Sequence, residues 1–386
     1  MIKKHTRLAP GEPELAAQGS FFRSHYPLSQ PALLVGLIYL LLLAFFVVVR
    51  HYSAFDFVHL GTVWGSHIAS GTWGYDGQFY YQLARNPLGA APYLDNAPYR
   101  YQHLLYPLLA WVLSLDQAAL VPYMLLLINL LAIVGSVELV ARLLVKRDLS
   151  PWFSLALGLY YGLAVGLTFD TTEPFTCVLL CLGVWQLDGQ RYVQAALWLG
   201  LAALSRETAV LFPLLLAISA LAHRRWGETF TLLALGVLPL VIFFAALALL
   251  FGHTGLTFTP PFEHVPFAGI FHYWYTPRKF WLLVLLILLP TLGSLGFLAW
   301  DLAHLRCKQF TLVWAASLGL LVFLSHSSYI ELVSCGRASI LAVLAGVLYA
   351  LKTRNKTLLW SLQFYACTFI VYFIGTWLRL DSFLAH

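Results

Sequence analysis

Long apolar runs recur along the whole of this 386-residue chain and constrain its fold more than any other feature. Eleven runs stand out, at residues 31–49, 118–143, 151–168, 174–187, 192–204, 207–222, 229–251, 280–300, 310–325, 335–351 and 357–378. A transmembrane helix needs about 20 apolar residues, and the two short runs at 174–187 and 192–204 are compatible with a tilted helical hairpin. We therefore expect an all-α, polytopic membrane protein with about 11 transmembrane helices, in a single domain over residues 31–386 behind a tail of residues 1–30.

Composition and the absence of known motifs exclude several classes of protein. Hydrophobic residues make up 60% of the chain and charged residues only 10%, whereas a soluble domain carries about 25% charged residues. A soluble enzyme, a disordered chain and a disulfide scaffold are therefore excluded, and the net charge of +6 indicates membrane anchoring rather than nucleic-acid binding. No HExxH, paired CxxC, Walker A or GxSxG motif is present, so we expect no cofactor and leave only a divalent metal open.

The distribution of basic residues predicts an orientation. With the N-terminus inside, fifteen of the 23 Lys and Arg residues lie in cytoplasmic segments and eight lie on the opposite side, as the positive-inside rule requires. The sequence thus predicts a multi-pass protein of the plasma or inner membrane with a cytoplasmic N-terminus. Two long loops, at about 50–117 and 252–279, then face outward.

The first of these loops holds the best candidate for chemistry. Asp76 precedes a segment whose apolar residues recur every three to four positions, which predicts a short amphipathic helix in the outer interface. Asp76 can alternatively serve only as its N-cap, and the tyrosines around it only as an aromatic belt. Asp56 is a second outer carboxylate in the same loop, and we expect Asp95, in a Pro- and Asn-containing turn, to be solvated.

Other polar groups interrupt apolar stretches at the same predicted edge. Glu173, Arg206 and Arg337 are far apart in the sequence, yet each is expected near the outer end of a span. Snorkelling to the interface is the alternative for the two arginines. Their shared face predicts an outward polar cavity with carboxylates for acid–base chemistry and guanidinium groups for a phosphate.

Five segments carry a family resemblance. Residues 76–84 read DGQFYYQLA and residues 106–109 read YPLL, followed by TEPF at 172–175, SRET at 205–208 and Gly-Arg at 336–337. This order resembles the GT-C superfamily of glycosyltransferases that use polyprenyl-phosphate sugars. The sequence is most similar to bacterial members of cell-surface glycopolymer formation, and more distantly to the mannosyltransferases of GPI-anchor assembly. The resemblance is best over residues 31–225.

The resemblance implies a GT-C-like fold and an inverting sugar transfer to a cell-envelope glycan or lipid on the outer face of the membrane. It implies that a carboxylate, Asp76 with Asp56 as runner-up, takes the proton of the acceptor hydroxyl. The partners would be a polyprenyl-phosphate sugar, the acceptor and membrane lipids. The candidate substrate-binding residues, for the phosphate or for the sugar, are Arg206, Arg337, Glu173, Arg100, Lys279, Gln78, Tyr80 and Tyr81.

Two other classes stay open at this stage. A transporter or flippase of a lipid-linked sugar would also be polytopic, although it should carry polar groups toward both membrane faces. A non-catalytic subunit of an envelope complex would need no carboxylate at all.

Overall fold

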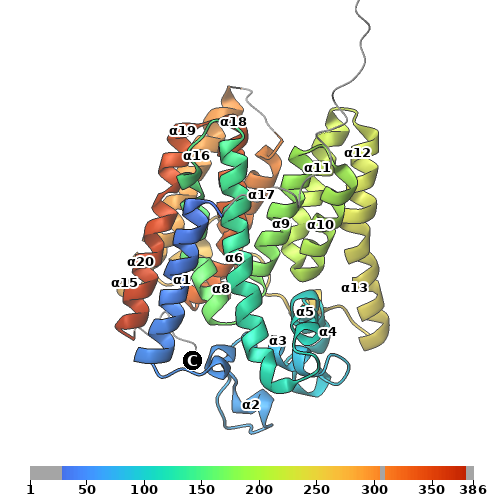
Figure 1. The fold of residues 1–386 in the computed structure, drawn as a ribbon, viewed down its shortest axis with the longest axis vertical. Helices are drawn as coiled ribbons and strands as arrows, with labels where there is room; N and C mark the ends of the chain where they lie inside the picture. The colour runs from blue at the N-terminus through green and yellow to red at the C-terminus, as the bar shows by residue number, and fades with distance from the viewer. Residues whose placement is uncertain (1–27, 305–308, 380–386) are drawn as a thin grey trace, which may run out of the picture.

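A computed structural model describes residues 28–304 and 309–379, and every regular element within these ranges is a helix. Most of the tail expected at residues 1–30 lies outside them. The bundle, shown in Figure 1, is formed by α1 (Gln30–Val49), α6 (Val121–Val145), α7 (Leu155–Gly158), α8 (Tyr161–Thr168), α9 (Glu173–Asp188), α10 (Tyr192–Ser205), α11 (Leu211–Ala222), α12 (Trp226–Thr231), α13 (Leu238–Phe251), α15 (Pro277–Leu283), α16 (Leu289–Ala303), α17 (Thr311–Val322), α18 (Leu332–Thr353), α19 (Lys356–Leu362) and α20 (Phe364–Trp377).

Six helical stretches of the described chain are long and apolar enough to cross a membrane. They are Gln30–Val49, Ala118–Val145, Trp226–Phe251, Pro277–Ala303, Leu332–Thr353 and Lys356–Trp377. Residues 151–168 add a seventh if the two helices Pro151–Gly158 and Tyr161–Thr168, bent by 53°, count as one span. The multi-pass membrane class is thus confirmed. The count of eleven is not, because runs such as Tyr192–Ser205 and Thr311–Val322 form shorter helices.

Helix α18 lies at the centre of the bundle. In an apolar stretch of 18 residues in α18, 83% of the residues are buried, against 22% in the corresponding stretch of the span that contains α13. A helix that is apolar all round and rich in small residues suits such a position, because small side chains let neighbouring helices approach closely. Gly336 shows this: a Cβ there would lie 2.4 Å from the ring of Tyr161 in α8. Helices α9 and α10 pack together as the hairpin that their short runs indicate.

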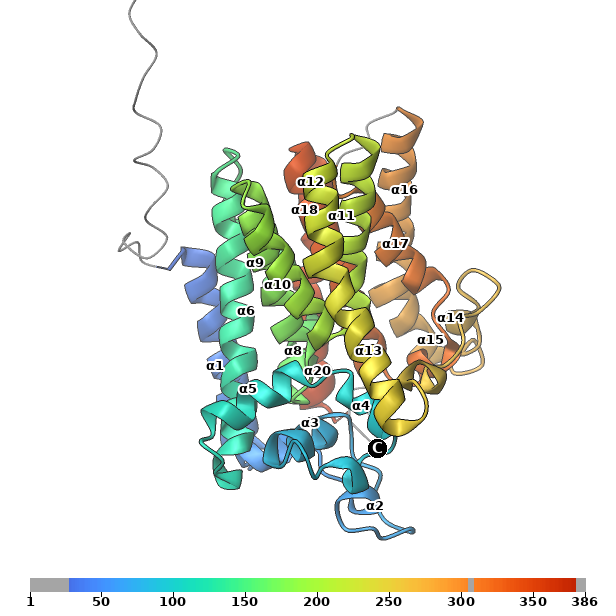
Figure 2. The same ribbon diagram turned by 90° about the vertical axis from the view of Figure 1, so that its right-hand side faces the viewer.

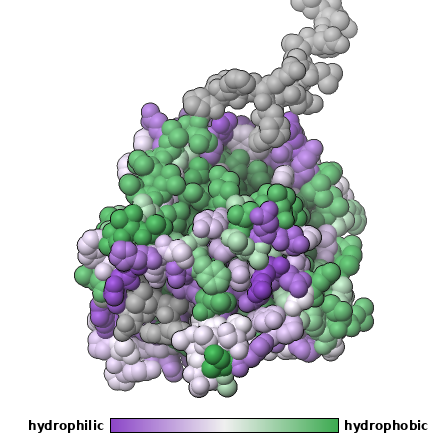
Figure 3. All heavy atoms as spheres, turned by 60° about the horizontal axis from the view of Figure 1, so that its bottom comes forward, coloured by the Kyte–Doolittle hydropathy of each residue, from purple (hydrophilic) through white to green (hydrophobic). Residues whose placement is uncertain are grey.

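The loop between α1 and α6 covers one end of the bundle. It contains α2 (Thr62–Gly65), α3 (Gly77–Arg85), α4 (Ala97–Tyr101) and α5 (Leu105–Leu113), while α14 (Ala268–Phe271) belongs to the second long loop. Figure 2 shows α2 to α5 gathered at this end. Figure 3 brings the same end forward, where hydrophilic surface collects while hydrophobic surface covers the flanks.

Helix α3 differs from the interfacial helix that its pattern predicts. Its residues from Gly77 to Ala84 are all buried. Phe79 and Leu83 pack into one apolar cluster and Tyr80 and Ala84 into another. The amphipathic spacing therefore reflects two protein neighbours rather than a boundary between lipid and water.

Candidate functional site

Asp76 stands at the start of α3, where a helix cap is expected, but its side chain makes no capping hydrogen bond. The carboxylate instead accepts from two guanidinium groups, Arg100 Nη1 at 2.9 Å and Arg337 Nη1 at 2.8 Å. The interpretation of Asp76 as a simple cap is therefore wrong. Gln78 braces this turn, since its amide accepts from the backbone N–H of Gly61 at 3.0 Å and donates to the carbonyl of Trp73 at 2.7 Å.

Glu173 begins α9, one residue before a proline that suits the first helical turn. Its Oε1 accepts from Nε and Nη2 of Arg337, at 2.9 and 2.8 Å. Nη1 of Arg206, in the break between α10 and the following helical turn, lies 3.2 Å from the same oxygen. Two arginines from distant segments thus share one buried carboxylate.

Close helix packing places Arg337 between the two carboxylates. The backbones of α8 and α18 meet at Gly162 and Gly336, because a Cβ on Gly162 would lie 2.3 Å from the Gly336 carbonyl oxygen. Arg337 follows directly, is 5% exposed, and also donates to the hydroxyl of Tyr75 at 3.1 Å. The Gly-Arg pair noted in the sequence therefore combines a close backbone approach with the central cation of the site.

The charged side chains form one alternating series. In order of contact they are Asp95, Arg100, Asp76, Arg337, Glu173 and Arg206. Asp95 binds Arg100 through two bonds of 2.7 Å, so the expectation that Asp95 is merely solvated is wrong. Burial alone would raise the pKa of Asp76, but the charges of Arg100 and Arg337 outweigh burial and hold this pKa well below its usual range. Asp76 is therefore ionised, and it is a weak base while both arginines contact it.

Four of these six charged residues line a cavity of about 480 Å³. Asp76, Glu173, Arg206 and Arg337 all contribute to its wall, so the four residues that the sequence analysis placed on one face do meet. The rest of the wall is largely apolar and comes from α11 with the turn before it, α17 with the segment after it, α18 and the second long loop. Its apolar residues are Val210, Leu211, Leu256, Phe262, Leu320, Leu321, Leu324, Ile340 and Leu341. The cavity wall thus combines charged groups with a hydrocarbon-like region.

A second polar pair enters the cavity wall and was missed as a site by the sequence analysis. Glu207 lines the cavity, and its Oε2 lies 2.5 Å from Nε2 of the fully buried His103. Tyr99 also lines the cavity, with its ring 5.3 Å from that of His103. The residues of this pair are 104 positions apart, so no local pattern in the sequence could have joined them.

The other residues predicted for the site lie elsewhere. Asp56 accepts from the backbone N–H and hydroxyl of Ser53, both at 2.7 Å, in an exposed turn outside the cavity. Tyr80 is fully buried beside His103, and Tyr81 lines a different surface hollow. The ammonium of Lys279 lies 3.4 Å from the ring centre of Tyr273 rather than in the cavity wall.

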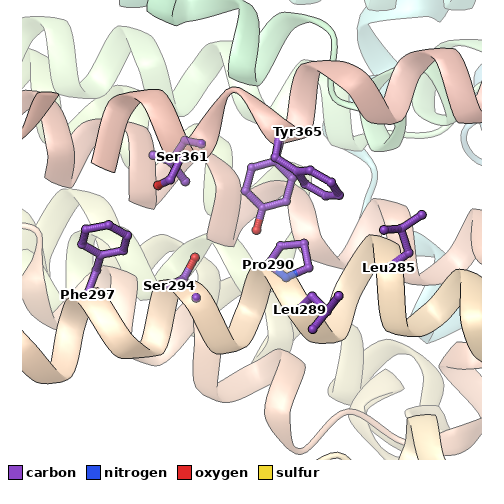
Figure 4. Close-up of a pocket in the computed structure, with 10 residues that line it drawn as sticks. Leu285, Leu289, Pro290, Ser294, Phe297, Ser361 and Tyr365 are labelled. Atoms are coloured by element: carbon purple, nitrogen blue, oxygen red, sulfur yellow. The ribbon is translucent and has the colours of Figure 1, made fainter. Parts of the chain in front are cut away.

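A second cavity lies away from the charged residues. A hollow of about 250 Å³ between α16 and α19–α20 is lined by apolar side chains with Ser294, Ser361 and Tyr365 (Figure 4). It contains no charged residue and so offers no group for acid–base chemistry. Over residues 28–304 and 309–379, no three His, Cys, Asp or Glu side chains converge as a metal site would require.

Comparisons with protein-family models, with curated proteins and with solved structures found no match to this chain.

Proposed function

We propose that the protein is an integral-membrane inverting glycosyltransferase that moves a sugar from a polyprenyl-phosphate donor to a hydroxyl of a cell-envelope glycan or lipid. The observation that carries this proposal is the cavity of about 480 Å³, whose wall combines Arg206, Arg337 and three carboxylates with a largely apolar remainder. A lipid-phosphate sugar has the same division into a charged head and a hydrocarbon tail. The likeness of the motifs to the GT-C superfamily supports the same class.

The arginines bind the donor phosphate. Arg206 lines the cavity, is 20% exposed at the side chain and makes one ion pair, at 3.2 Å with Glu173, so it has N–H donors left for a ligand. Arg337 lies behind it and shares Glu173. Two guanidinium groups around one carboxylate can turn their remaining donors toward phosphate oxygens, and charge-assisted hydrogen bonds to phosphate are among the strongest available.

Asp76 is the base in this proposal. The oxygen of the acceptor attacks C1 of the sugar, the bond from C1 to the phosphate oxygen breaks with its electron pair going to the phosphate, and Asp76 accepts the hydroxyl proton. When the donor phosphate draws Arg337 toward itself, the contact between Arg337 and Asp76 weakens. The pKa of Asp76 then rises toward the operating pH, which makes the carboxylate a better base.

Transfer assays with purified protein test this function. Proteoliposomes receive a panel of radiolabelled polyprenyl-phosphate sugars and a lipid and glycan fraction from cell envelopes, and label transferred to the acceptor is measured. Asp76→Asn should lower transfer by about 10²–10⁴-fold, because an amide cannot accept the proton. Arg100 and Arg337 keep Asp95 and Glu173 as partners, so the variant should still fold.

Asp56→Asn is the matched control, because it removes the other candidate carboxylate of the same loop from outside the cavity. Normal transfer in Asp76→Asn together with a loss in Asp56→Asn would exchange the two roles. Movement of intact donor between leaflets, with no transfer to any acceptor, would contradict the proposed enzyme activity and identify the protein as a flippase.

A further inference from the structure

Three basic side chains converge on one carboxylate at the end of the bundle opposite the cavity. Lys146 and Arg147 follow the last residue of α6, Asp188 ends α9, and Lys352 lies in the last turn of α18. The Lys352 ammonium is 3.2 Å from Asp188 Oδ1, the Lys146 ammonium is 3.5 Å from Oδ2, and Arg147 donates to Oδ1. We refer to Lys146, Arg147, Lys352 and Asp188 as the Asp188 cluster.

The cluster carries excess positive charge in a fixed arrangement. Three cations face one carboxylate, which leaves a net charge of +2 at this place. The side chains of Lys146 and Lys352 are 47% and 24% exposed, whereas Asp188 is 12% exposed. The shared anion thus sits beneath the cations and offsets their mutual repulsion while their outer donors remain accessible.

The position of the cluster indicates what it meets. The candidate spans that contain α6 and α18 end at Val145 and Thr353, so the cations lie where a membrane span reaches the head-group layer. The Lys146 ammonium also lies 4.3 Å from the ring centre of Trp185, and tryptophan is enriched at that layer. A phosphate of a membrane lipid lies in the head-group layer, at the level of these cations, whereas an anion dissolved in water is not confined to that layer.

We propose that the Asp188 cluster binds the head group of an anionic phospholipid, with Lys146, Lys352 and Arg147 directed at the phosphodiester oxygens. Basic pockets between membrane helices bind anionic head groups in this way. The inference does not depend on the proposed sugar transfer, because no residue of the cluster contacts the cavity. It gives this end of the protein a binding function of its own.

Native mass spectrometry of the full chain, released from detergent and titrated with phosphatidylglycerol, measures this binding directly. Replacing Lys146 and Lys352 together by Gln should weaken phosphatidylglycerol binding by about tenfold or more, given roughly 1 kcal/mol for each basic residue near a membrane surface. Phosphatidylcholine, which has no net charge, should bind equally to both forms. The matched control is Arg224→Gln with Lys356→Gln, since both are exposed cations outside the cluster and remove the same total charge.

The results distinguish a specific lipid-binding site from general attraction of an anionic lipid to positive charge. Selective loss in the cluster variant supports the site, and equal losses in both double variants, or none in either, would overturn it. Displacement of the lipid by soluble glycerol phosphate would also contradict it, because the phosphate alone would then suffice. If the double variant does not fold, Lys146→Gln alone is informative, since its contact with Asp188 is long and exposed and its loss leaves Arg147 and Lys352 in place.

Discussion

Conservative arginine-to-lysine replacements should affect the two cavity arginines differently. Arg337 makes three contacts of 2.8–2.9 Å with Asp76 and Glu173, each from a different nitrogen, and the single nitrogen of a lysine cannot reproduce all three. Arg337→Lys therefore loses at least one buried charge-assisted bond, which is worth about 1.5–3 kcal/mol of unfolding free energy. Arg206 makes one contact, at 3.2 Å, and is partly exposed. Arg206→Lys should then cost only about 0–1 kcal/mol.

Thermal unfolding in detergent, followed by tryptophan fluorescence at one scan rate, provides the comparison. We expect the unfolding midpoint of Arg337→Lys to fall well below that of Arg206→Lys. Sugar transfer should fall in both variants, since an ammonium cannot form the bidentate contact with a phosphate. Arg206→Lys should thus separate function from stability.

A double-mutant cycle supplies the control. Glu173→Gln and Arg337→Lys, made separately and together, should show an interaction energy well above the scatter expected for independent sites, about 0.3–0.5 kcal/mol. Equal midpoints for the two lysine variants, or additive losses in the cycle, would refute the view that Arg337 holds the site together while Arg206 faces the substrate.

Three further predictions concern the loops and the orientation of the chain. Burial lowers the pKa of His59 to about 4 from an ordinary value of 6.5, so the unfolded chain takes up a proton first and stability should fall between pH 6.5 and pH 4. His59→Gln should make the unfolding midpoint less dependent on pH over that range. Gly77→Ala would place a Cβ 2.4 Å from a backbone oxygen of the turn between α8 and α9; we expect a loss of about 1–3 kcal/mol, seen as a lower unfolding midpoint, together with reduced transfer. In a cysteine-free background, an impermeant maleimide on intact cells should label a cysteine at Leu88, which is 97% exposed, and not one at Gly227; the reverse pattern would place the cavity on the cytoplasmic side.

Periodicity and composition predicted the long helices well, because a span depends on its own residues. The runs at 31–49 and 335–351 correspond to α1 and to most of α18. The bend within 151–168 was not predicted, since no proline or charge marks the break at Leu159 and Tyr160 and only Gly158 precedes it. After the bend, α8 packs against α18, where two glycines let the backbones approach closely.

The charged residues that line the cavity could be selected from the sequence, whereas the contacts between them could not. Ionisable residues in apolar surroundings are conspicuous in a sequence, and this signal identified Asp76, Glu173, Arg206 and Arg337. The partner of each is set by contacts between segments as much as 261 positions apart, as for Asp76 and Arg337. The same limitation explains the misjudged Asp95, whose arginine partner is only visible once the turn at 95–100 has folded.

The pattern of ion pairs also bears on how a lipid donor would reach the cavity. Helices α9 and α18 are joined at both ends, by Glu173 with Arg337 beside the cavity and by Asp188 with Lys352 at the far end. The wall from the second long loop is held to the end of α17 and the segment after it by two backbone bonds and by the hydroxyl of Tyr273, which donates to the carbonyl of His326. Glu263 adds an exposed contact, since it accepts from the backbone N–H and lies beside the ring of His326. An exposed ion pair contributes about 0–1 kcal/mol, whereas breaking a buried one costs about 3–5 kcal/mol. Opening of the cavity is therefore expected on the side of the second loop, next to the apolar residues that would receive the lipid tail, while α9 and α18 keep the arginines and carboxylates in place.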